Sequence, residues 1–342
     1  MTKSLAMAVL LFLIFSTVQT EAQVPGPLKL VDTISLPGLN DGDFDHFAVD
    51  VPGNRLFVAA EENSAVEVVD IRTNKLVHTI RGPKAPHSLA YDLDAKKLFV
   101  VDDGGPNQVE VYDGTSFELV ETIPMKAHAD ASIYDAVNKL FYVGNGGKAA
   151  HEDYCLISVI DTTSLKKVAD IRVDSDRVEA MALEEKGPRL FVNLYSKGAV
   201  AVIDRQKREV ISTWSLAPEG TNNGPLAFDK LDHRLFVLAR EPGKLIVLDS
   251  SSGKIVATRQ CVGDYDDAIY EAQSGRLYLI GDPFLRVFQK RTGRDRYDSL
   301  GQIPTAFHAD TGLLVPKLNR LYIAVNHHGQ TDAVIQVYEV VP

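Results

Sequence analysis

A short run of apolar residues recurs along the chain, and each copy is opened by a basic residue. The copies begin at Arg55, Lys97, Lys139, Arg189, Arg234, Arg276 and Arg320. Aromatic and β-branched residues follow the basic residue, a composition typical of β-strands. Successive copies begin 42 to 50 residues apart. A regular period of this length indicates a repeat architecture.

Each of these strands has three companions within its unit. One run precedes it, as in 47–50, a second follows about ten residues later, as in 66–70, and a third comes next, as in 75–80. Four short strands in a unit of this length predict one blade of a β-propeller. No sustained 3.6-residue periodicity is found after residue 23, so we expect no long helix. The sequence therefore predicts an all-β, seven-bladed β-propeller with four-stranded antiparallel blades.

The two ends of the chain are expected to share the last blade. The seventh unit holds only three runs before Pro342. Segment 29–34, KLVDTI, matches segment 75–80, KLVHTI, at all positions but one. We therefore expect the N-terminal strand to complete the last blade and close the ring, which leaves no open sheet edge.

The repeat resembles the YVTN-type β-propeller family, the YncE-like proteins. The residues closest to the family pattern are Phe191-Val192-Asn193, Val202-Ile203-Asp204 and Val159-Ile160-Asp161-Thr162. The resemblance extends over the whole of 23–342 and implies an exported seven-bladed propeller. It implies no particular activity, because one fold hosts many functions.

The first 22 residues have the pattern of a secretory signal peptide. Lys3 precedes the apolar run 5–18, and Thr20-Glu21-Ala22 places small residues at the −3 and −1 positions of a cleavage site. The run is short for a membrane span, and an uncleaved anchor is the alternative. We expect a signal peptide over 1–22, a single propeller domain over 23–342, and export to the periplasm or the extracellular space.

Charge and cysteine content narrow the partners. With 36 Lys and Arg against 46 Asp and Glu, the net charge is −10, which repels nucleic acid. We expect a monomer with no nucleic-acid partner and no membrane span in the mature chain.

An oxidising compartment allows Cys155 and Cys261 to form a disulfide, but their spacing in the sequence does not decide whether they do.

Several aspartates have a structural explanation. Asp70, Asp113, Asp161, Asp204 and Asp249 end the third strands, and Asp50, Asp92, Asp135 and Asp229 follow the first strands. Because they stand directly before turns, we expect their side chains to accept backbone N–H groups there.

Another column of polar residues stands at the start of the first strands. It reads Asp45, His87, Asp130, Glu179, Gly224, Asp266 and Asp310. The first strand of a blade is the innermost, so this column is expected to surround the mouth of the central channel. Carboxylates bind hard cations and imidazole binds transition metals. The candidate metal ligands are Asp45, Asp130, Glu179, Asp266 and Asp310.

A second column, two residues earlier, faces the same side of each strand. It contributes His128, which with His87 is a candidate general base, and Arg177, Asn222 and His308 as candidate ligand-binding residues. Loops that open on the same face add His151 and His327. The alternative is that both columns only line a water-filled channel.

Two functions remain after motif analysis. The chain has no Gly-x-Ser-x-Gly elbow, Walker loop, His-Glu-x-x-His or dinucleotide fingerprint. The first function is an exported binding or scaffold protein whose rim holds a small-molecule or protein partner. The second is a metal-assisted hydrolase or lyase, similar in architecture to seven-bladed lactonases and streptogramin lyases. A divalent cation (Ca, Mg or Zn) is the one candidate cofactor, and sensitivity to a chelator distinguishes the two.

Overall fold

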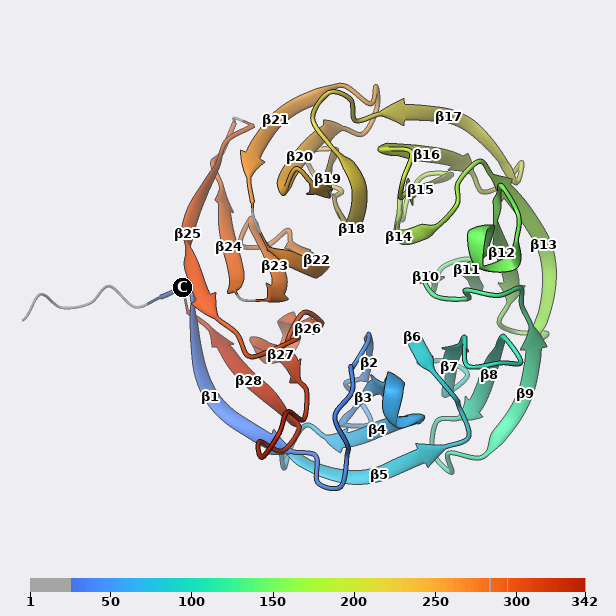
Figure 1. Cartoon of the computed structure of the whole chain (residues 1–342), viewed down its shortest axis with the longest axis vertical. Coiled ribbons are helices and arrows are strands. Elements are labelled where there is room, and N and C mark those ends of the chain that lie inside the picture. Colours follow the sequence, from blue (N-terminus) through green and yellow to red (C-terminus); the bar gives the residue numbers. More distant parts are fainter. Residues whose placement is uncertain (1–25, 262, 283, 294, 342) are drawn as a thin grey trace, which may run out of the picture.

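The computed structural model describes residues 26–261, 263–282, 284–293 and 295–341. The predicted signal peptide, 1–22, lies outside these residues. Seven four-stranded antiparallel sheets are arranged as blades around a central axis (Figure 1). The predicted seven-bladed propeller is therefore confirmed.

The strands occupy four concentric positions. The innermost strands are β2 (Phe47–Asp50), β6 (Pro86–Asp92), β10 (Ser132–Asp135), β14 (Val178–Leu183), β18 (Thr221–Asp229), β22 (Asp264–Glu271) and β26 (Gly312–Val315). The second strands are β3 (Arg55–Ala60), β7 (Lys97–Asp102), β11 (Leu140–Gly146), β15 (Arg189–Leu194), β19 (Arg234–Glu241), β23 (Arg276–Asp282) and β27 (Arg320–Val325).

The third strands are β4 (Ala65–Asp70), β8 (Gln108–Asp113), β12 (Cys155–Asp161), β16 (Ala199–Asp204), β20 (Lys244–Asp249), β24 (Phe284–Lys290) and β28 (Val334–Val340). The outermost strands are β5 (Lys75–Arg81), β9 (Leu119–Pro124), β13 (Lys166–Val173), β17 (Glu209–Ser215), β21 (Ile255–Gln260), β25 (Tyr297–Pro304) and β1 (Leu28–Ser35). Three short 3₁₀ helices complete the described elements: η1 (Glu61–Asn63), η2 (Gly147–Ala150) and η3 (Pro316–Leu318).

The hydrophobic core lies between the blades. In the second strand β3, every residue after the basic one is buried, because both faces of the sheet pack on neighbouring blades. Seven apolar clusters of the described residues each join two adjacent blades; one, for example, contains Phe99 of β7 and Phe141 of β11. The outermost strands, such as β9, are largely exposed. This packing holds the innermost strands in fixed positions around the axis.

The N-terminal strand closes the ring as predicted. β1 pairs antiparallel with β28, from Leu28 opposite Val340 to Ser35 opposite Val334. The last blade therefore consists of β26, β27, β28 and β1, and the start of β1 lies beside the C-terminal end of β28 in Figure 1.

The turn aspartates accept backbone N–H groups, as predicted. Asp70 accepts the backbone N–H groups of Arg72 and Thr73, and the corresponding aspartates of other blades make equivalent bonds. Cys155 and Cys261 are both buried and free, so they form no disulfide with each other. Within the described residues, no helix has the length and apolar character needed to cross a bilayer.

Candidate functional site

The innermost strands carry an irregularity at the predicted column. In β6, His87 and Ser88 lie together opposite a single residue of β7. Register shifts occur at the same level in β14, β18 and β22. A β-bulge bends its strand and re-aims the side chains at that point. In these four blades the column residues therefore lie at bulges.

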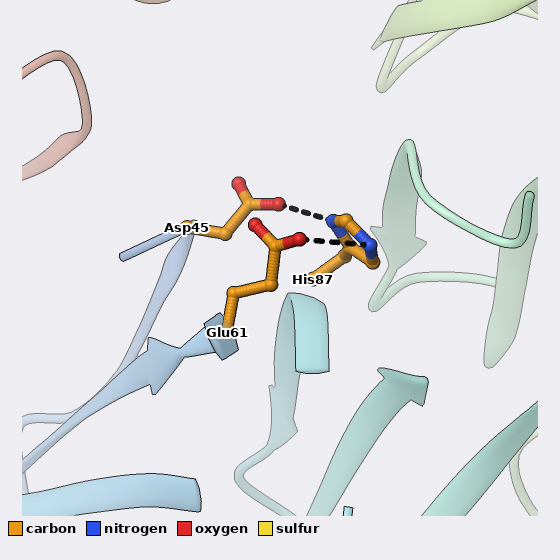
Figure 2. Close-up of side chains that lie close together, drawn as sticks. All are labelled: Asp45, Glu61 and His87. Atoms are coloured by element: carbon orange, nitrogen blue, oxygen red, sulfur yellow. Dashed lines mark hydrogen bonds and ion pairs between the residues drawn. The ribbon is translucent and has the colours of Figure 1, made fainter. Parts of the chain in front are cut away.

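Asp45, Glu61 and His87 form the first cluster of ligand-type side chains (Figure 2). Asp45 Oδ2 lies 2.7 Å from His87 Nδ1, and Glu61 Oε1 lies 3.6 Å from His87 Nε2. One ligand atom from each residue lies within 4.8 Å of the others. Asp45 is only 7% exposed, and its Oδ1 makes no hydrogen bond. One imidazole and two carboxylates are donors that divalent metals accept.

A second cluster shares Asp45 with the first. It consists of Asp45, His46 and Asp266, again with one ligand atom of each within 4.8 Å of the others. His46 Nε2 lies 3.3 Å from Asp45 Oδ1, and its Nδ1 lies 3.4 Å from Asp267 Oδ1. Blades 1 and 6, numbered from β2 onward, thus meet at Asp45 across the channel mouth.

Two further column residues extend the site beyond the clusters. Asp130 Oδ1 lies 3.9 Å from His87 Nδ1, and Asp130 Oδ2 lies 3.8 Å from His128 Nε2. The Asp103 side chain accepts the backbone N–H of His128 and so fixes the strand start. The structure therefore brings both candidate bases, His87 and His128, to one carboxylate.

Glu179 lies on a basic side of the ring. It forms an ion pair with Arg177, and its Oε2 lies 3.9 Å from Arg240 Nη1. Arg240 also contacts Asp266, at 3.0 Å. A Cβ on Gly224 would lie 3.3 Å from the Arg240 guanidinium carbon, so the glycine leaves room for this side chain. Arg240 thus brings a positive charge to the one column position that lacks an ionisable residue.

The electrostatics of the ring reflect burial and crowding. Burial, with the charge of Asp45, raises the pKa of Glu61 and that of Asp266 to about 7. Burial and the charge of Asp266 raise the pKa of Asp310 to about 8. Burial disfavours a charged His87, but its bond to Asp45 and nearby carboxylates outweigh burial and raise its pKa to about 9. Without a cation, the fold therefore favours the protonated forms of Glu61, Asp266, Asp310 and His87. The pKa of Asp45 is instead lowered, because its burial is outweighed by the charges of His46 and His87 and by the hydrogen bond from His87.

We expect the cation-free protein to lose stability as pH rises from about 5 to about 9. Glu61, Asp266 and Asp310 bind protons in the folded state at pH values where the unfolded chain releases them, and this advantage disappears as pH rises through their folded pKa values. His87 acts in the same direction, because its contribution is complete below its unfolded pKa and lost toward about 9. Thermal unfolding with chelator present should show a fall in Tm on the order of 5 °C.

The variant Asp310→Asn serves as the control for this pH profile. It removes one carboxyl group whose pKa is raised, so its Tm should depend less on pH than that of the parent protein. A parent profile that is flat or rises between pH 5 and 9 would contradict the prediction.

The remaining candidate ligand-binding residues lie outside the two clusters. His308 contacts Asp43 at 3.0 Å and stacks on the exposed Phe307, and His327 is hydrogen-bonded to Asp41. His151, directly after η2, has a left-handed backbone conformation. Asn222, the second residue of β18, has one as well. Their assignment as ligand-binding residues stays a prediction.

Below the ring, the channel contains a cavity of about 250 Å³. Residues of all seven innermost strands or their starts line it, with Asp266 and Glu179 at the charged end and Leu89, Met181 and Leu226 among the apolar residues. Ligands bind preferentially in concave sites that combine apolar walls with a few polar groups. The cavity therefore offers space for a small ligand next to the two clusters.

Three charged residues of the site were missed in the sequence. Glu61 comes from η1, outside any strand column, His46 follows Asp45 directly, and Arg240 belongs to a second strand. The pair Glu61-Glu62 directly after a buried strand was the one local signal that could have identified the first of them.

Comparison with known proteins gives distant similarity. No family model matches the chain. A curated protein, dihydro-heme d1 dehydrogenase of Pseudomonas aeruginosa, is 22% identical over 253 residues, which cover 70% of this chain and 48% of that protein. The chain thus spans about half the length of this relative.

Solved structures resemble nearly the whole chain. A chain of the mitotic checkpoint complex matches 99% of this chain and 100% of its own, with a TM-score of 0.75 and 14% sequence identity. The structure of U3-55K matches 90% of this chain and 98% of its own, with a TM-score of 0.75 and 13% sequence identity. Hydrazine synthase of Kuenenia stuttgartiensis matches 88% of this chain and 98% of its own, with a TM-score of 0.73 and 17% sequence identity. At these identities the similarity shows the propeller fold alone.

Proposed function

We propose that this chain is an exported, YncE-like propeller that binds a divalent cation at the mouth of its channel and a small polar ligand beside it. The observation that carries the proposal is the convergence of Asp45, Glu61 and His87 within 4.8 Å. A β-propeller supplies a rigid scaffold for such a binding site, since its innermost strands are fixed by the packing between blades.

The burial of Asp45 supports a cation over a merely hydrated channel. A buried carboxylate needs opposite charge or hydrogen bonds. Asp45, which is 7% exposed, has His87 at 2.7 Å from Oδ2 and His46 at 3.3 Å from Oδ1, and Oδ1 accepts no hydrogen bond. The neighbouring carboxyls of Glu61 and Asp130 have raised pKa values, mainly through burial. A bound divalent cation would relieve both conditions, because it compensates several carboxylates at once.

The variant pair Glu61→Gln and Glu62→Gln tests the cation site. Both residues belong to η1, but only Glu61 is part of the cluster, while Glu62 is exposed. After chelator treatment and reloading with Zn²⁺, Mn²⁺ or Ca²⁺, we expect Glu61→Gln to hold less cation than the parent protein and Glu62→Gln to hold the same amount. Inductively coupled plasma mass spectrometry measures the content. A parent protein that retains no cation would refute the proposal.

The ligand is expected to bind at the rim around the cation. The channel cavity of about 250 Å³ is suited to a small molecule or to one end of a larger one. We expect Arg177, which pairs with Glu179, and Asn222 to contact the ligand. The same glutamate variants separate cation-dependent ligand binding from binding elsewhere.

Export is part of the proposal and rests on the pattern of residues 1–22. We expect the protein recovered from outside the cytoplasm to begin at Gln23, because cleavage follows small residues at −3 and −1. N-terminal sequencing measures this directly. Recovery of the uncut chain from the membrane fraction would favour the anchor instead.

A metal-assisted hydrolase or lyase is the second candidate function. The observation in its favour is His128, whose Nε2 is buried without a hydrogen bond and lies 3.8 Å from Asp130. An imidazole so placed could take a proton from a cation-bound water. Turnover of lactones or esters that chelator abolishes would support this function, and its absence across such a screen would support the binding protein.

A further inference from the structure

Asp45 points its two carboxylate oxygens at two different clusters. Oδ2 lies 2.7 Å from His87 Nδ1, whereas Oδ1 lies 3.3 Å from His46 Nε2. The second oxygen accepts no hydrogen bond, although the residue is only 7% exposed. A buried oxygen of this kind usually has a partner. His46 is the ion-pair partner of this oxygen, and Asp266 brings a further carboxylate oxygen within 4.8 Å of both residues, outside the first cluster.

The backbone places His46 beside Asp45 on the channel side. The Asp45 N–H donates to the carbonyl of Ala59, and the Ala59 N–H donates to the carbonyl of His46. Two consecutive residues thus pair with one residue of β3, as in a bulge, and both side chains reach Asp266 of blade 6. A regular strand would have turned them to opposite faces.

A carboxylate behind His46 orients its ring. Nδ1 lies 3.4 Å from Asp267 Oδ1, which leaves Nε2 facing Asp45 and Asp266. Metal-binding histidines almost always present their other ring nitrogen to a carboxylate, carbonyl or water, and that partner fixes the tautomer. Asp267 is therefore placed to bind the proton-bearing Nδ1 of His46 and to leave Nε2 as the nitrogen that can bind a metal.

Arg240 leaves the second cluster open to a cation. Its guanidinium donates to Oδ1 of Asp266 at 3.0 Å and also contacts Asp264 at 3.2 Å. A carboxylate has two oxygens and about four acceptor positions, so one arginine contact does not exhaust Asp266.

We infer that the channel mouth holds a second divalent cation between Asp45, His46 and Asp266, and that Asp45 bridges the two cations. The inference rests on the proposed function, since the first cation occupies the cluster of Asp45, Glu61 and His87. Each cluster combines one imidazole with two carboxylates, a donor set that favours Zn²⁺ or Mn²⁺ over Ca²⁺ or Mg²⁺. Paired cations of this kind lie about 3.5–4 Å apart when groups bridge them.

The test counts cations in the full-length mature protein and in matched variants. Chelator-treated protein is loaded with Zn²⁺ and analysed by native mass spectrometry. We expect two ions in the parent protein and one in each of Glu61→Gln, His46→Asn and Asp266→Asn. The control is Asp264→Asn, which should keep two ions, because Asp264 shares the Arg240 contact but belongs to neither cluster. Circular dichroism verifies that each variant is folded.

The outcomes separate the inference from the proposed function. A single ion in the parent protein that Glu61→Gln removes and His46→Asn retains would overturn the second site alone. No ion at all would overturn both. With Mn²⁺, two bridged ions give an exchange-coupled electron paramagnetic resonance spectrum. Two ions with independent spectra would overturn the bridging role of Asp45.

Discussion

Replacing Asp45 with asparagine is expected to weaken divalent-cation binding by more than about a hundredfold. Loss of a residue that merely orients a metal ligand costs about 10- to 100-fold in affinity, and Asp45 is itself a ligand-type residue in both clusters. Asparagine keeps the shape of the side chain but removes its charge. Isothermal titration with Zn²⁺ or Mn²⁺ at pH 7 measures the effect.

The same substitution has a second readout that does not depend on the cation. The bond between Asp45 and His87 contributes to raising the pKa of His87 to about 9. In Asp45→Asn without metal, the pKa of His87 should fall toward the ordinary histidine value of about 6.5, as followed by NMR titration. Unchanged values for both cation affinity and His87 would show that Asp45 does not organise the site.

Asp43→Asn is the matched control for this variant. Asp43 stands two residues earlier and carries the same functional group, but it contacts His308 and Asn326 rather than the two clusters. We therefore expect the affinity for the cation to stay close to that of the parent protein. A loss equal to that of Asp45→Asn would indicate an effect of overall charge rather than of ligation.

The fold could be predicted from the sequence because its pattern is repeated. The apolar run of β3 recurs in every blade, so each copy supports the assignment of the others. The similarity of 29–34 to 75–80 located the strand that closes the ring, because β1 occupies in the last blade the place of β5 in the first. A fold can be predicted from the sequence when the local pattern and the global architecture agree in this way.

The site could be predicted only where it follows the strand period. The column that contains Asp45, His87 and Asp266 was found because equivalent positions of the blades converge on one axis. His46 was missed because strict alternation places it on the opposite face from Asp45, and the bulge at Ala59 cancels that alternation. The period-two rule holds for regular strands alone.

Glu61 and Arg240 were missed for different physical reasons. Glu61 begins a 3₁₀ helix, whose direction the strand pattern does not specify. Arg240 reaches the ring from a second strand beside Gly224, at a column position whose own residue has no side chain. A long side chain from a neighbouring strand can occupy a position that its own residue number does not suggest.

The variant Ile34→Asp is expected to open the ring and lower Tm by more than about 10 °C. Of the eight residues of β1, only Leu28 and Ile34 are buried. Ile34 is 1% exposed, lies opposite Ile335 of β28 and packs in the cluster that joins the last blade to the first. A charged side chain at this place is buried without a partner and loses the apolar contacts as well, which costs several kcal/mol. Differential scanning fluorimetry measures the shift.

The comparison with Val31→Asp shows whether burial or strand charge is responsible. Val31 belongs to the same strand but is 39% exposed, so an aspartate there keeps contact with water and should change Tm little. Once β1 is released, β28 becomes an edge strand with unpaired backbone groups, which favours pairing between chains. Size-exclusion chromatography should therefore find larger species for Ile34→Asp alone. An Ile34→Asp protein that elutes and melts like the parent would mean that the last blade is stable with three strands and that the N-terminal strand is not required for closure.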